Sequence, residues 1–184
     1  MTPVLIPPIL YTKRCKLDRI TLHDMDMLRD IVEDSQFRLF MPELYEVVHE
    51  VEGMHHFLRS FDMSAQKGEG FLWGIRKNNF LIGFVAIMDL SYDPTIFYAM
   101  HREYRNKGYA KEVATEIVAY FRTISKAPLH TEVYSLNQAS LAVLAFCGFK
   151  IVGSIDDKIL LKMQDELTFR EKVSNYARNN GLVH

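Results

Sequence analysis

The segment from Thr95 to Phe121 constrains the fold of this chain more than any other part of the sequence. It opens with the apolar run Thr95–Met100, which is typical of a buried strand. After a turn, apolar residues recur at the spacing of one helix face: Ala110, Val113, Ala114, Ile117, Val118 and Phe121. The pattern predicts a strand, a turn and an amphipathic helix, an arrangement found in many α/β proteins.

The turn predicts an anion site, and its residues are Arg105, Asn106, Lys107, Gly108, Tyr109 and Ala110. The first N–H groups of a helix have no intrahelical partner and the helix dipole is positive there, so a pyrophosphate is stabilised if side chains do not block it. Gly108 and Ala110 leave the approach open, and Gly108 can adopt backbone angles that other residues avoid. Ordinary packing without a ligand is the alternative for such a turn.

The turn fits the pattern Arg/Gln-x-x-Gly-x-Gly/Ala, which resembles the acyl-CoA pyrophosphate loop of the GNAT superfamily of N-acetyltransferases. Asn106 replaces the first glycine of the usual Arg-Gly-Lys-Gly, and asparagine is among the few residues that adopt left-handed backbone angles. Before the loop, Phe97 stands where a glycine is common and Arg102 where a proline is common. Neither change removes the anion site, but both can reshape the acceptor side of the pocket.

A second signature lies downstream, where Asn137 and Ser140 are followed by Leu144 and then by Gly148-Phe149. It resembles the Asn-x-x-Ser…Leu…Gly-Phe run of the RimJ/RimL-like branch, whose members acetylate ribosomal-protein N-termini. With a looser match that begins at Thr12, the resemblance covers roughly residues 12–163 in one unbroken order, as fits a single domain.

The resemblance implies a GNAT fold, an α/β (α+β) arrangement in which a mixed sheet of about six or seven strands is flanked by about four helices. It also implies acetyl-CoA as the cosubstrate. No metal is expected, because His49, Glu52 and His56 lack the His-x-x-x-His spacing with a third strong ligand. Residues 105–110 would hold the pyrophosphate. The backbone of Met100 and His101 would pair with pantetheine, while Asn137 orients pantetheine or holds the turn into the next helix.

Acetyl transfer to an amine requires a base for the amine proton and a donor for the departing thiolate. Glu132 precedes Asn137 at a spacing that resembles the general base of RimI-like alanine N-acetyltransferases, and a solvent-facing strand glutamate is the alternative. Leu144 stands where many GNAT enzymes carry a tyrosine, so the RimL-like resemblance implies Ser140 as the donor to the CoA sulfur. A hydroxyl that only caps the helix is the alternative for Ser140.

The remaining pattern predicts six more strands, three more helices and a tight hairpin turn at Asn78-Asn79, where both residues tolerate positive φ. The expected strands are an opening strand near Lys16–Thr21, strands over Phe71–Arg76, Phe80–Leu90 and Leu129–Tyr134, and a closing hairpin of Phe149–Ile155 and Lys158–Met163. The expected helices are one after Thr21 with Asp24 in a capping box, one over Glu46–Phe61 with Val47 and Val51 facing inward, and a short one over Ala139–Cys147.

Composition favours one domain over residues 1–184, because 184 residues with 48% hydrophobic content can build a full core. Two distant cysteines favour a reduced cytoplasmic protein, and the N-terminal run shows neither a signal peptide nor a membrane span. A formal net charge of −1 does not indicate a protein that binds nucleic acid. A helical tail over 165–184 has an apolar stripe that includes Phe169 and Val173, so the chain is expected to be a monomer or a homodimer.

The sequence therefore predicts a cytoplasmic N-acetyltransferase that moves an acetyl group from acetyl-CoA to a primary amine by direct transfer. The acceptor is either a peptide N-terminus or a small-molecule amine. The alternative is a noncatalytic acyl-CoA-binding or partner-binding module on the same fold. Leu144 favours this alternative, because it stands where many GNAT enzymes carry a tyrosine. A flavodoxin-like protein is disfavoured, because the loop follows several strands rather than the first and no Gly-x-Gly-x-x-Gly is present.

Overall fold

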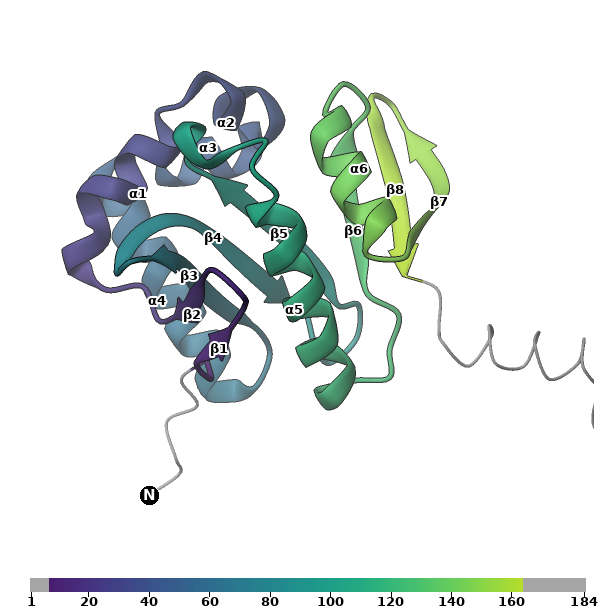
Figure 1. Ribbon diagram of the computed structural model, residues 1–184, viewed down its shortest axis with the longest axis horizontal. Coiled ribbons are helices and arrows are strands. Elements are labelled where there is room, and N and C mark those ends of the chain that lie inside the picture. Colours follow the sequence, from purple (N-terminus) through teal and green to yellow (C-terminus); the bar gives the residue numbers. More distant parts are fainter. Residues whose placement is uncertain (1–6, 164–184) are drawn as a thin grey trace, which may run out of the picture.

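Eight strands form one mixed sheet in the computed structural model, which describes residues 7–163 (Figure 1). The strand order is β1-β2-β3-β4-β5-β6-β8-β7, and β5 and β6 are the parallel pair among antiparallel neighbours. The strands are β1 (Leu10–Tyr11), β2 (Lys16–Asp18), β3 (Phe71–Lys77), β4 (Phe80–Met88), β5 (Thr95–Met100), β6 (His130–Tyr134), β7 (Phe149–Ile155) and β8 (Lys158–Met163).

Helices cover both faces of the sheet, with α1 to α4 on one face and α5 and α6 on the other (Figure 1). They are α1 (Met25–Val32), α2 (Ser35–Phe40), α3 (Pro42–Val48), α4 (Val51–Lys67), α5 (Tyr109–Ile124) and α6 (Gln138–Phe146), with short 3₁₀ turns η1 (Leu22–Asp24) and η2 (Arg102–Tyr104). The predicted mixed α/β fold is confirmed. The described part has one strand and two helices more than expected, because β1 and α2 were missed and one predicted helix is two.

Each face of the sheet has its own apolar core. Ile117 and Phe121 of α5 pack with Trp73 of β3 on one side, and Leu28 of α1 and Phe57 of α4 pack on the other. Because side chains alternate along a strand, β5 contributes to both cores. Its residues Ile96 and Met100 join the α5 side, whereas Ala99 joins the α1–α4 side.

The helix predicted over Glu46–Phe61 is wrong as a single element, since the chain breaks between α3 and α4. Val47 and Val51, which were expected to face the core, are exposed. The physical reason lies at Gly53, where an added Cβ would lie 1.8 Å from the carbonyl oxygen of Val47. Glycine therefore lets the end of α3 rest directly against the first turn of α4.

Two local predictions are confirmed. Asn78 and Asn79 both have positive φ, 49° and 68°, in the turn between β3 and β4. At the start of η1, the Thr21 backbone N–H donates to Asp24 Oδ2 at 2.8 Å. Burial by itself raises the pKa of Asp24, but Arg76 donates to both carboxylate oxygens and, with Thr21, holds that pKa below its ordinary value. This charged pair ties the first helical segment to β3.

The sheet is continuous between β5 and β6 at one end only. Thr95 pairs with His130, the His130 N–H donates to Pro94 O at 2.8 Å, and Thr131 Oγ1 donates to Ile96 O at 2.8 Å. Past these contacts the two strands diverge (Figure 1). We refer to the gap between residues 97–100 of β5 and residues 132–134 of β6 as the split.

Some expectations fall outside the described residues. These are the N-terminal run up to residue 6 and the helical tail predicted over 165–184. Within residues 7–163, no helix has both the length and the apolar character needed to cross a membrane.

Candidate active site

The predicted anion loop caps the N-terminus of α5. Gly108 is the N-cap residue and has φ of +80°, a conformation that L side chains rarely adopt. Asn106 also has a positive φ, 58°, as expected for asparagine in place of glycine. Asn106, Lys107 and Gly108 are exposed, so the first amides of α5 are accessible to an anion.

Arg105 positions the loop through its side chain. Its Nη2 lies 2.7 Å from Asp34 Oδ1, and its Nε donates to Met100 O at 3.0 Å. Burial raises the pKa of Asp34, but the Arg105 guanidinium outweighs burial and holds the pKa below its usual value. The arginine of the motif thus joins the end of β5 to the start of α2, with its charge already paired. Sequence reasoning missed Asp34, because no local pattern links it to the loop.

Arg14 supports the loop from the opposite side, although the two segments are far apart in the chain. Its Nη1 donates to Lys107 O at 2.9 Å, and its Nε lies 2.7 Å from Glu112 Oε2 in the first turn of α5. The guanidinium carbon stacks 4.1 Å from the centroid of the Tyr109 ring. The Lys77 ammonium lies 5.2 Å from the same centroid, so the loop is surrounded by cationic side chains.

The backbone of β5 has one edge directed toward the split. The His101 N–H donates to Ile82 O at 2.9 Å, and this N–H is therefore used in pairing with β4. Because backbone direction alternates in an antiparallel ladder, the N–H groups of Tyr98 and Met100 point the other way. The acceptors Ile96 O and Met100 O, which bond to Thr131 and Arg105 side chains, confirm that alternation.

The His101 side chain is buried and held by polar partners. Its Nε2 lies 2.7 Å from Asp30 Oδ2, and its Nδ1 accepts from the Glu103 N–H at 3.2 Å. The contact with Nδ1 assigns the proton to Nε2, so the ring donates to Asp30. The hydrogen bond from His101 lowers the pKa of Asp30. His101 therefore joins the end of β5 to α1.

Asn137 and Ser140 begin α6 on the other side of the split. Asn137 Oδ1 accepts from the Ser140 backbone N–H at 3.2 Å, so Asn137 is the helix cap. The Ser140 hydroxyl is left for other contacts, and Tyr98 is one of its neighbours. Leu144 is 1% exposed and packs in the core between α5 and the sheet.

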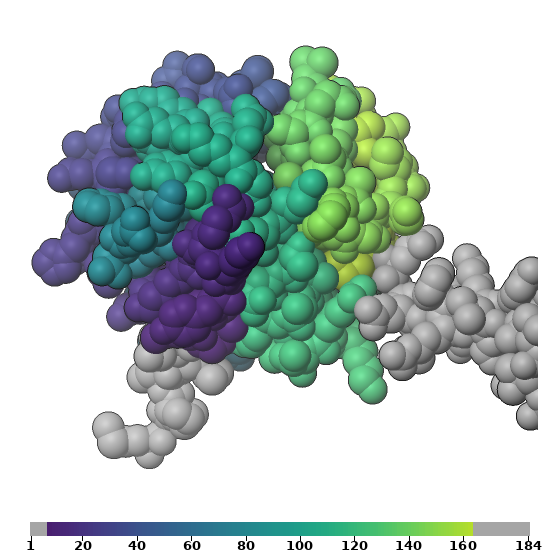
Figure 2. All heavy atoms as spheres, in the orientation of Figure 1, coloured from purple at the N-terminus to yellow at the C-terminus, as the bar shows by residue number. Residues whose placement is uncertain are grey.

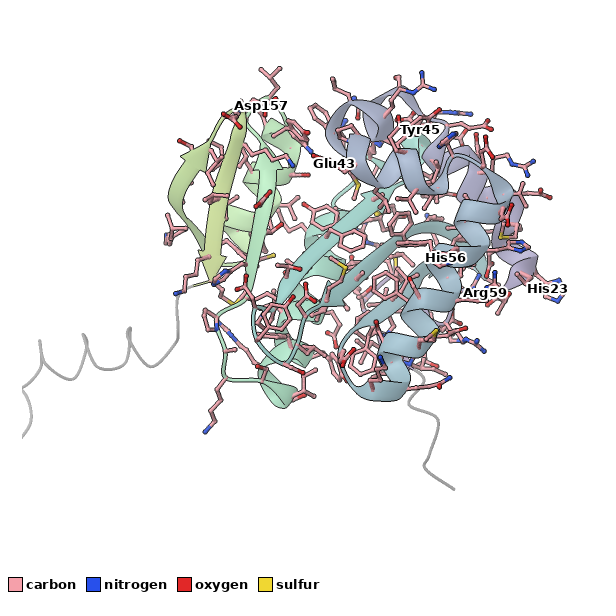
Figure 3. All side chains as sticks on the ribbon, turned by 180° about the vertical axis from the view of Figure 1, so that it is seen from behind. His23, Glu43, Tyr45, His56, Arg59 and Asp157 are labelled. Carbon is pink, nitrogen blue, oxygen red and sulfur yellow. The ribbon has the colours of Figure 1, made fainter. Side chains whose placement is uncertain are left out.

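Glu132 lies on the face of the sheet that carries α1 to α4. Its neighbours Thr131 and Val133 are buried on the opposite face, and its own side chain is exposed. Lys158 Nζ lies 3.7 Å from Glu132 Oε2 and 2.7 Å from Glu43 Oε1. Figure 3 shows Glu43 on α3 beside β6 and β8, so this ion pair connects α3 with the strands beyond the split.

The α5 and α6 walls are joined near the loop. Lys111 Nζ lies 4.3 Å from the centroid of the Phe146 ring, and Thr115 Oγ1 lies 3.7 Å from Cys147 Sγ. On the face drawn in Figure 2, the teal atoms that include α5 lie beside the green atoms that include α6. Residues 7–163 contain no group of three His, Cys, Asp or Glu side chains suited to a metal ion.

The model of the acetyltransferase (GNAT) domain matches residues 14–150. The chain belongs to this family. The match covers most of the chain, including the loop, Glu132 and Ser140. A protein of Bacillus subtilis (strain 168), the uncharacterized N-acetyltransferase YoaA, is 28% identical over 153 residues, which are 79% of this GNAT chain and 85% of that protein.

Solved structures share the predicted GNAT fold. RimJ of Mycobacterium smegmatis, in complex with CoA-disulfide, has a TM-score of 0.74 and 19% identity over 87% of this chain and 88% of that one. RimL, a ribosomal L7/L12 alpha-N-protein acetyltransferase in complex with coenzyme A, has a TM-score of 0.72 and 14% identity over 84% of this chain and 97% of that one. These likenesses confirm the fold.

Proposed function

We propose that this GNAT protein transfers an acetyl group from acetyl-CoA to a primary amine on a peptide N-terminus or a small molecule. The observation that carries the proposal is the position of the split beside the loop. The edge of β5 that lacks a partner strand past Thr95 leads through η2 to Gly108 at the start of α5. A pyrophosphate at the loop and a pantetheine chain along β5 would satisfy both.

The residues present fit CoA in two respects. The cationic Arg14, Lys77 and Lys107 surround the loop where phosphates would lie. The Met100 N–H points toward the split, where a pantetheine amide oxygen can accept from it. The name of the RimJ structure includes a CoA derivative, and that protein shares this fold.

The direction of transfer follows from the two faces of the sheet. CoA would lie on the α5–α6 face, whereas Glu132 projects from the α1–α4 face, from which the amine would arrive. Glu132 would accept the amine proton, so that the nitrogen lone pair can attack the thioester carbon. The Tyr98 N–H would donate to the developing oxyanion, and Ser140 would contact the sulfur. A direct transfer of this kind needs no covalent enzyme intermediate.

The test combines an acceptor screen with one isosteric variant. Release of CoA from acetyl-CoA would be followed with N-terminal peptides and small amines as acceptors. Glu132→Gln should lower kcat by roughly 10²-fold while acetyl-CoA affinity stays the same, because only the base is removed. Glu69→Gln, at an exposed glutamate outside the site, is the matched control.

Two results would reject parts of the proposal. Wild-type kinetics of Glu132→Gln across pH 6 to 9 would remove Glu132 from its role. Tight acetyl-CoA binding without turnover of any acceptor would favour a noncatalytic acyl-CoA-binding module instead.

A further inference from the structure

Tyr98 is a buried titratable group to which the proposed transfer assigns no side-chain role. It lies in β5 between Ile96 and Met100, with its ring on the α5–α6 face. Its hydroxyl is buried and has no hydrogen-bond partner among the described atoms. A buried hydroxyl without a full hydrogen-bond partner is unfavourable, so a bound ligand that accepts from it would be stabilised by that contact.

The surroundings of the hydroxyl locate that ligand. Ser140 of α6 interacts with the Tyr98 hydroxyl closely enough to lower its pKa, and Cys147 lies close enough to raise it, although the Tyr98–Ser140 contact falls short of a full hydrogen bond. The Tyr98 backbone N–H points toward the split, on the strand segment past the last β5–β6 contact. A thioester whose carbonyl accepts from this N–H therefore has its sulfur near the Tyr98 and Ser140 hydroxyls.

We propose that Tyr98 Oη donates a hydrogen bond to the CoA sulfur as the thioester C–S bond breaks. The proposal rests on the acetyl transfer proposed above and adds a catalytic residue to it. The Leu144 side chain on α6 cannot donate a hydrogen bond. Tyr98 extends from the sheet toward α6, where Ser140 is its neighbour. The phenol thus supplies a donor from β5 that α6 lacks at position 144.

The step balances without net proton transfer from the tyrosine. The amine nitrogen forms the C–N bond, the C–S bond breaks, and its electron pair passes to sulfur. The amine proton goes to Glu132, and the thiolate takes a proton from water on release, since an ordinary thiol pKa is about 8.5. Burial raises the pKa of Tyr98 to about 12, so the phenol stays a donor throughout the working pH range.

The first test is Tyr98→Phe, which removes one oxygen and keeps the ring. We expect kcat to fall about ten- to hundredfold, the range for a lost hydrogen bond to a charged group, with KM for acetyl-CoA within about twofold. Tyr120→Phe is the matched control, because Tyr120 is a tyrosine of the same core that packs on Phe71 and Trp73, and it should keep wild-type kcat.

The second test needs neither an acceptor nor turnover. The thiol of bound CoA would be titrated through the ultraviolet absorbance of its thiolate, in wild type and in Tyr98→Phe. A donor at the sulfur lowers the thiol pKa in wild type, and the variant should return that pKa toward the value for free CoA by about one unit, a tenfold change in ionisation.

The outcomes separate this inference from the proposed function. If no amine is acetylated but the thiol pKa rises in Tyr98→Phe, the hydrogen bond stands and the proposed activity fails. If transfer to amines is found but the variant keeps the wild-type kcat and thiol pKa, the role of Tyr98 is overturned. A variant with lower CoA affinity and a lower melting temperature but an unchanged thiol pKa would also overturn it, because this result indicates a packing role for Tyr98.

Discussion

At the scale of single residues, Gly108 shows how a backbone conformation can leave the start of a helix without a covering side chain. Its φ of +80° turns the chain from η2 into α5, and an added Cβ would lie 3.3 Å from Arg14 Nη2. A side chain at this position would therefore meet backbone strain and the guanidinium that supports the loop. The absence of a side chain also leaves the first amides of α5 open.

Gly108→Asp is expected to lower acetyl-CoA affinity more than tenfold, because a carboxylate would occupy the place of the anion. Isothermal titration measures the affinity. Gly68→Asp is the control, since Gly68 has a similar φ of +69° at the far end of α4 and should keep wild-type affinity. Wild-type affinity in a folded Gly108→Asp protein would show that the loop does not bind the pyrophosphate.

At the scale of elements, the contact between α3 and α4 determines where Glu43 lies. Glu43 lies in the first turn of α3 and forms the ion pair with Lys158, so the position of α3 determines where that carboxylate lies. The end of α3 in turn rests on Gly53 of α4. A small residue in α4 thus positions a charged residue at the split.

Gly53→Ala separates helix propensity from packing. Propensity alone predicts stabilisation by about 1 kcal/mol, whereas the contact with Val47 O predicts destabilisation by about 1–3 kcal/mol, because α3 must move. We expect the second effect to prevail in urea unfolding monitored by circular dichroism. Glu52→Ala, at the exposed neighbouring position, is the control, because it changes helix propensity without adding a contact with the Val47 carbonyl. A Gly53→Ala protein more stable than wild type would show that α3 and α4 do not pack this closely.

At the scale of the whole molecule, the split divides the sheet into two parts. The strands β1 to β5 form one part and β6, β8 and β7 the other, with Thr95 and His130 as the paired residues between them. The two parts are also joined on opposite faces by the Lys111–Phe146 contact and the Glu43–Lys158 ion pair. A ligand that fills the split would add contacts to both parts at once.

We expect CoA to stabilise the folded chain as a unit. At a free concentration 100-fold above Kd, binding adds about 2.7 kcal/mol, which corresponds to a rise in Tm of about 5–10 °C for a chain of this size. Differential scanning fluorimetry measures the rise, and hydrogen exchange should show added protection at the Tyr98 and Met100 amides. Gly108→Asp at the same CoA concentration is the control. Unchanged Tm and unchanged protection in wild type would contradict binding in the split.

Much of the fold could be predicted because its signals are local. The apolar face of α5, the Asn78-Asn79 turn and the pattern around Gly108 each depend on residues that are neighbours in the chain, so periodicity and backbone preference reveal them. The break between α3 and α4 could not be predicted, because Gly53 matters through the Val47 carbonyl that it contacts. Helix propensity alone predicts only that a glycine weakens a helix by about 1 kcal/mol relative to alanine.

The features of the candidate site likewise fall into those that the sequence predicts and those that only the tertiary structure shows. The sequence alone determined the loop, its helix and the family resemblance, because these depend on residue order and short spacings. The tertiary structure decided that Arg105 pairs with Asp34 and that the hydroxyl of Tyr98 is buried without a partner near Ser140. Those facts depend on segments that are distant in the chain and meet only when the sheet forms, and no local pattern specifies such meetings.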